Sequence, residues 1–94
     1  MSRNVTDDRD QSRYEITVDG ALAGFAEYRL RGDGGTVVFT HTEVFPDYEG
    51  QGVGGALARG ALDDVRSAGR TVVPQCPFIK SWIDKHPDYQ DVLA

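Results

Sequence analysis

The stretch PDYEGQGVGGALARG, residues 46–60, contains five glycines and leads into a segment with helical spacing. Glycine is costly to order, so a cluster of glycines at a helix start suggests a backbone held close to a ligand or to another part of the chain. The first turn of a helix also has unpaired N–H groups and a partial positive charge, which favour an anion. The stretch therefore predicts a strand, a glycine turn and a helix, with either a phosphate or a packing contact at the turn.

The residues before this turn have the pattern of antiparallel strands. YEITVDG (14–20) alternates apolar and polar residues and ends in an Asp-Gly hairpin signal. Segments 21–32 and 36–45 continue the pattern on either side of a DGG turn at 33–35. Residues 1–13 are polar apart from one valine, which indicates a flexible N-terminal tail.

After the turn, apolar residues recur at helical spacing over 54–65, and Gly69 is a natural helix end. An apolar strand over 70–76 and a second helix over 77–86 follow, with a final short strand or tail after them. A chain of 94 residues is one domain's length. The sequence predicts an α+β domain over 14–94: an antiparallel β-meander, a helix, a parallel strand and a C-terminal helix.

Composition excludes several classes of partner. The net charge is −5 and the basic residues are scattered, which argues against nucleic acid. No apolar run approaches the roughly 20 residues that cross a bilayer, so we expect no membrane partner. The start of the chain lacks a secretory signal, and Cys76 is the single cysteine. We therefore expect a cytoplasmic protein without an internal disulfide, and we predict no metal site.

Two familiar phosphate motifs do not fit the glycines. A dinucleotide fingerprint on Gly50, Gly52 and Gly55 requires an acid about 20 residues further on, where this chain has Gln75. The phosphate loop of nucleotide hydrolases requires Lys and Ser or Thr after the last glycine, where Ala56 and a leucine stand. A glycine turn whose helix N–H groups hold a diphosphate needs neither feature.

EGQGVGGAL resembles the acetyl-coenzyme A turn of the GCN5-related N-acetyltransferases, whose pattern is Arg or Gln, two residues, Gly, one residue, Gly or Ala. Gly52 and Gly54 match the glycine positions, whereas Glu49 stands where that pattern has Arg or Gln. PQCPF (74–78) and HPDYQDVL (86–93) extend the resemblance to the small single-domain branch of this superfamily, of the yjdJ type.

The resemblance implies that acetyl-CoA is the cofactor, with its diphosphate on the turn and its pantetheine arm along the strand before it. It also implies that this strand diverges from the next one near Val44, at a break flanked by Val72 and Val73. Helix residues Lys80 and Ser81 are candidates for further contacts, with a solvated helix face as the alternative. The implied cofactor-binding residues are Val44, Phe45, Gln51, Gly52, Val53, Gly54, Gly55, Lys80 and Ser81.

Three residues are candidates for catalysis. His41 titrates near neutrality and can accept a proton from an ammonium group, or it can be a histidine hydrogen-bonded on a sheet face. Glu43 lies in the strand region where larger relatives often keep a carboxylate base, or it is an exposed strand acid. Cys76 precedes the second helix, whose start favours a thiolate, or it is a small buried side chain.

The implied function is transfer of an acetyl group from acetyl-CoA to a primary amine, on a small molecule or a protein lysine. Larger relatives hold the acceptor with extra helices between the first two strands, and here only VDGAL (18–22) joins them. The acceptor is therefore unknown, and a homodimer partner is a possible source of the missing surface. The alternative function is a non-catalytic module that binds CoA or acyl-CoA.

Overall fold

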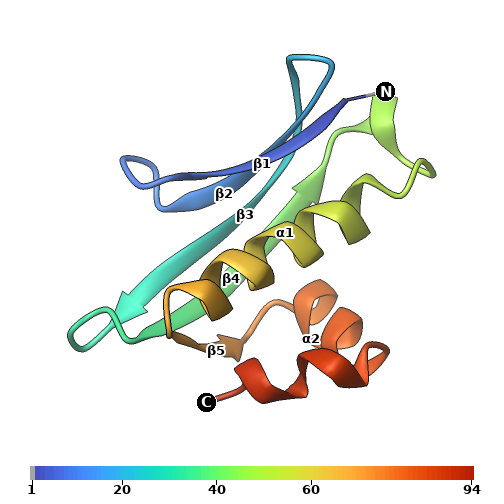
Figure 1. Ribbon diagram of the computed structural model, residues 1–94. Coiled ribbons are helices and arrows are strands. Elements are labelled where there is room, and N and C mark those ends of the chain that lie inside the picture. The colour runs from blue at the N-terminus through green and yellow to red at the C-terminus, as the bar shows by residue number, and fades with distance from the viewer. Residues whose placement is uncertain (1) are drawn as a thin grey trace.

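The computed structural model describes residues 2–94, which form a five-stranded sheet with the helices packed against one of its faces (Figure 1). The strands lie in chain order across the sheet. β1 to β4 are antiparallel neighbours, and β5 joins parallel to β4. The sequence predicts this arrangement for β2 to β5 but not for β1. The elements are β1 (Arg3–Asp8), β2 (Arg13–Val18), β3 (Ala21–Arg31), β4 (Thr36–Val44), η1 (Pro46–Tyr48), α1 (Val53–Ser67), β5 (Thr71–Pro74), α2 (Pro77–Asp84) and η2 (Pro87–Val92).

The hairpin between β2 and β3 confirms its sequence signal. Asp19 and Gly20 both have positive φ, at 50° and 87°. This is the backbone that a two-residue turn needs to match the twist of the strands it joins. Alternate residues of β2 are buried, and these pack toward α1.

The flexible tail predicted for residues 1–13 is wrong over residues 3–13, and Met1 lies outside the described residues. Arg3–Asp8 forms β1, and every residue of it pairs with β2. Val5 packs against α1, where its Cγ2 lies 2.7 Å from the position that a Cβ on Gly60 would take. An edge strand with a solvated face needs only one or two inward side chains, so its polar composition concealed it.

The core lies between the sheet and the two helices. Phe39 of β4 is fully buried there, with the rings of Tyr14 and Tyr28 6.0 and 6.3 Å away. The Tyr14 hydroxyl donates to Asp64 over 2.6 Å, and that of Tyr28 donates to Asp7 over 2.6 Å. Burial first, and then these carboxylates, raise the pKa of both phenols.

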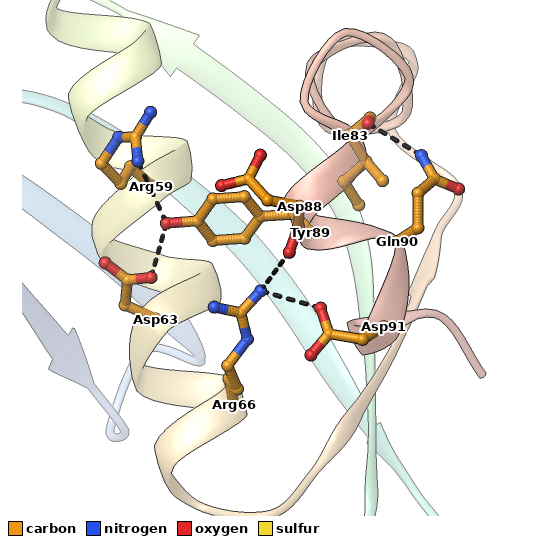
Figure 2. A network of polar contacts seen from close by, with 8 residues as sticks. All are labelled: Arg59, Asp63, Arg66, Ile83, Asp88, Tyr89, Gln90 and Asp91. Carbon is orange, nitrogen blue, oxygen red and sulfur yellow. Dashed lines mark hydrogen bonds and ion pairs between the residues drawn. The ribbon is translucent and has the colours of Figure 1, made fainter.

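The end of the chain is a 3₁₀ helix and not the strand or tail that the sequence suggested. η2 returns across α1, where the Tyr89 hydroxyl donates to Asp63 over 2.7 Å and accepts from Arg59 over 3.2 Å (Figure 2). Arg66 donates to Asp91 over 2.8 Å. The bond to Asp63, and then burial, raise the pKa of Tyr89. After η2, the chain makes one bridge to β5, at Val72.

No helix within residues 2–94 combines the length and the apolar character that crossing a membrane would require.

Candidate functional site

β4 is paired on both sides over its first half and on one side over its second. β5 pairs with β4 from Thr36 only as far as Phe39, which lies opposite Pro74. The expected divergence of these strands is present, but Val72 and Val73 lie before it, opposite the paired half. Beyond it, residues 40–44 pair with no described strand on the β5 side, and we call this backbone the open edge.

A β-bulge sets the direction of the amides on the open edge. His41 pairs with Glu27 of β3 and Phe39 pairs with Tyr28, so Thr40 is an extra residue that shifts the register. Further along, the Phe45 amide donates to Ala23 of β3 over 2.9 Å. Because successive amides of an extended strand point to opposite sides, those of Thr42 and Val44 point away from β3. The open edge therefore presents two N–H groups, on alternate residues, that have no partner within residues 2–94.

The catalytic candidates of β4 lie on the face of the sheet opposite to α1 and α2. His41 Nε2 lies 3.2 Å from Glu43 Oε1, and both side chains are 53% exposed. The ring of Phe25 lies 6.3 Å from the His41 ring and 6.1 Å from that of Phe45. Phe45, expected to bind the cofactor, thus has its ring in this aromatic row and its amide bonded to β3.

Cys76 lies on the opposite side of β4, facing the core. Its side chain is 3% exposed, and its Sγ donates to the Thr42 hydroxyl over 3.3 Å. Its amide donates to Phe39 O over 2.9 Å, immediately before the open edge begins. The structure therefore separates Cys76 from the His41–Glu43 pair by the thickness of one strand. The sequence analysis expected the pantetheine arm along the strand that contains Thr42, but it did not anticipate the bond between Thr42 and Cys76.

The glycine turn carries unpaired amides at the start of α1. Gly50 and Gly52 have φ of 77° and 75°, which explains why glycine stands at both positions. The first helical bond runs from the Ala56 amide to Gly52 O. In the part of the chain that the structure describes, the amides of residues 51–55 donate to no protein acceptor. A diphosphate fits such a set of donors.

Two glycines of the turn have a packing role as well. A Cβ on Gly54 would lie 2.9 Å from the ring of Phe78 and 3.5 Å from Val44. A Cβ on Gly55 would lie 3.6 Å from the Trp82 indole nitrogen, an ordinary contact. Gly54 is therefore required by the packing of α2 onto α1, and its Cα surface is covered by Phe78. Its backbone amide remains in the unpaired set.

The other two expected contacts on α2 do not converge on the turn. Lys80 pairs with Asp84 over 3.6 Å and lines a hollow of about 280 Å³ beside β5. Phe78, which reaches the turn, precedes Lys80 by two residues, or about 200° around a helix, so Lys80 points away from it. Ser81 is exposed. The side chains that α2 brings to the turn are those of Phe78 and Trp82, and neither is among the expected cofactor contacts.

Within residues 2–94, no group of three His, Cys, Asp or Glu side chains is arranged to hold a metal ion.

The comparisons with known proteins point to one family. The model of a family described as GCN5-related N-acetyl-transferase matches residues 13–92. A GCN5-like protein from Staphylococcus aureus, solved by NMR, superposes with a TM-score of 0.72 at 24% identity, over 97% of this chain and 87% of that one. No curated protein sequence is significantly similar.

Two larger proteins contain the same fold. Ard1 from Thermoplasma volcanium has a TM-score of 0.58 at 22% identity, over 70% of this chain and 45% of its own. A ribosomal-protein-alanine N-acetyltransferase from Brucella melitensis biovar Abortus 2308 has a TM-score of 0.59 at 24% identity, over 87% of this chain and 60% of its own. The chain thus spans about half the length of these two, which carry further structure.

Proposed function

The chain belongs to the GCN5-related N-acetyltransferase family, and on that premise we propose that it transfers an acetyl group from acetyl-CoA to a primary amine. One observation carries the proposal. The unpaired amides of residues 51–55 and the unpaired amides of the open edge lie at the two ends of one short connection, η1 and its flanks. A ligand with a diphosphate and an extended amide-containing arm satisfies both sets of donors.

The chain's own backbone would hold most of the cofactor. The amides of residues 51–55 bind the diphosphate, helped by the partial positive charge of the α1 N-terminus. Thr42 and Val44 offer N–H groups along the open edge, where the pantetheine arm pairs as a strand would. Acetyl-CoA supplies an activated acyl thioester. An amide of the same edge can donate to its carbonyl oxygen as negative charge develops there.

The acceptor amine approaches from the uncovered face of the sheet, where His41 and Glu43 stand beside the open edge. His41 accepts the proton that the ammonium group must lose before its nitrogen can attack. Glu43, within 3.2 Å of Nε2, orients the ring and offsets the charge that it gains. The amine thus approaches the open edge from one face of the sheet, and Cys76 lies on the other, buried face.

Cys76 is a second candidate for chemistry, as an acyl carrier. Its burial and its bond to Thr42 favour a structural role, whereas its place beside the open edge favours contact with the thioester. Alkylation by iodoacetamide distinguishes the two. Protection by acetyl-CoA of an otherwise reactive thiol supports the carrier role, and an inert thiol excludes it.

A binding module without turnover is the competing function. The β2–β3 connection is a two-residue turn, so it adds no element over the face of the sheet where His41 and Glu43 lie and an acceptor would be held. Both candidate bases are half exposed there. A second copy of the chain could complete that surface, and sedimentation with and without acetyl-CoA tests this proposal.

Two measurements test the function in sequence. Isothermal titration with CoA and acetyl-CoA measures binding, with NAD as the negative control. Release of free CoA thiol in the presence of polyamines or lysine peptides then measures turnover. Binding with release supports the transferase, and binding without release supports the module. Failure of both coenzymes to bind would overturn both functions.

A further inference from the structure

Arg3 of β1 lies against the glycine turn, 48 residues away in sequence. Its Nη2 donates a hydrogen bond to the carbonyl oxygen of Gln51. Its Nη1 lies 3.7 Å from the position that a Cβ on Gly52 would take, so the guanidinium covers the turn at the residue that caps α1. Figure 1 shows the same arrangement at the level of the chain, with the N-terminal end of β1 beside the segment that precedes α1.

The position of Arg3 is fixed by the fold. Arg3 pairs with Val18 in the β1–β2 ladder, and at the adjacent position Ser2 and Asp19 exchange two hydrogen bonds, of 2.7 and 2.8 Å. Two residues along, Val5 fills the space left by the missing side chain of Gly60 on α1. β1 is therefore docked onto both the sheet and the helix, and its first residue is held at the start of α1.

The turn itself lacks a cation. Residues 45–58 contain no Lys or Arg, and Asp47 and Glu49 give this stretch a negative charge. Glu49 stands where the family's turn pattern has Arg or Gln. A diphosphate carries negative charge, and backbone amides alone leave much of it uncompensated. Only one of Arg3's N–H groups is used by a partner within residues 2–94, so its fork retains free donors.

We propose that Arg3 supplies the missing cation and binds the diphosphate of the coenzyme together with the amides of the turn. The proposal rests on the proposed function and adds to it a phosphate contact from outside the turn. β1 also lies outside residues 13–92, the region that the family model matches. Arg3 is suited to the role because a guanidinium can bond a carbonyl and a phosphate oxygen at once.

Isothermal titration of the full chain tests this contact. CoA and dephospho-CoA both carry the diphosphate, whereas pantetheine lacks it. Arg3→Ala is expected to weaken binding of both nucleotides by about five- to tenfold, since a charge-assisted bond at an exposed site is lost. Binding of pantetheine should not change. Arg9→Ala, at an exposed arginine of the β1–β2 turn, is the matched control and should bind like the wild type.

The outcomes distinguish a failure of the role of Arg3 from a failure of the proposed function. If the wild type does not bind CoA, the function fails; if it binds and Arg3→Ala binds equally well, only the role of Arg3 fails. An equal loss for pantetheine would also overturn that role. Should Arg3→Ala lower the urea midpoint, Arg3→Gln, which keeps a donor for Gln51 O without the charge, must show the same selective loss. Glu49→Arg, added to Arg3→Ala, is expected to restore the affinity for CoA.

Discussion

The two halves of β4 have the same secondary structure and opposite roles. In the first half, Val37, Val38 and Phe39 are buried and have a strand on each side. In the second half, exposed and half-buried residues alternate, and one edge has no partner. The boundary between the halves is the bulge at Thr40.

The difference shows how a small domain can spare backbone donors for a ligand. Unpaired N–H groups inside a protein are costly, so they persist only where water or a ligand can reach them. The paired half carries the packing that stabilises the sheet. The unpaired half is paired along one edge only, with β3, and on its core face Cys76 donates to Thr42. The four predictions below test this division.

Removing the ring at the centre of the paired half should have the largest effect. Phe39→Ala leaves a cavity beneath Tyr14 and Tyr28, so we expect a loss of about 3–5 kcal/mol in the free energy of unfolding, measured by urea denaturation. Thr42→Val, three residues later and of the same shape as the wild type, loses only the bond from Cys76, and about 1 kcal/mol is expected. Equal losses would contradict the division.

His41→Asn should separate activity from stability in the other half. If His41 is the base, the rate of thiol release should fall about a hundredfold. The side chain is 53% exposed, so the unfolding free energy should stay within about 0.5 kcal/mol. Glu43→Gln, which keeps the shape but not the charge, should give a smaller loss with a shifted pH profile. Wild-type rates in both variants would remove this pair from the mechanism.

Gly24→Ala should disturb the pairing of β3 with the unpaired half of β4. A Cβ there would lie 2.5 Å from the Glu43 carbonyl oxygen and 3.2 Å from the Val44 Cα, so backbone must move. We expect a loss of about 1–3 kcal/mol in urea denaturation, together with weaker CoA binding. Gly55→Ala meets only Trp82 at 3.6 Å and should leave stability unchanged or slightly raised. A neutral Gly24→Ala would show that β3 does not constrain the edge.

Alkaline pH should weaken the core that packs against the paired half, through Tyr14 of β2. The pKa of Tyr14 is raised in the folded protein, chiefly by burial and then by Asp64, so its stabilising contribution is complete below the ordinary phenol pKa of about 10 and declines above it. Roughly 1 kcal/mol should be lost by pH 11 from this group. Tyr14→Phe should be less stable at pH 7, having lost the bond to Asp64, but flatter between pH 9 and 11. Identical slopes would refute the assignment.

Much of the fold could be predicted from the sequence. Asp19-Gly20 and the alternation before it indicate the first hairpin, and the spacing from Gly54 to Val65 indicates α1, because both signals are local. β1 could not be found in this way. Its pairing with β2 and its contact with Gly60 are made across the fold, and its own residues carry almost no apolar signal.

The candidate site was predictable in part. The glycine turn could be located because left-handed φ at Gly50 and Gly52 limits the choice of residue. The bulge that turns the edge amides could not, since nothing in THTEV signals where β5 stops pairing. Phe78 packs on Gly54, and Lys80 therefore points away from the site. Which of these side chains faces the turn depends on the orientation of α2 about its own axis relative to α1.

The sequence by itself determined which segments extend, where the chain turns and where a helix begins with free amides, because these follow from backbone preferences over a few residues. The tertiary structure decided which of His41, Thr42 and Glu43 share a face with Cys76, and which arginine stands beside the turn. Those relations arise from strand register and from the docking of an edge strand, and register is fixed by contacts between residues far apart in the chain.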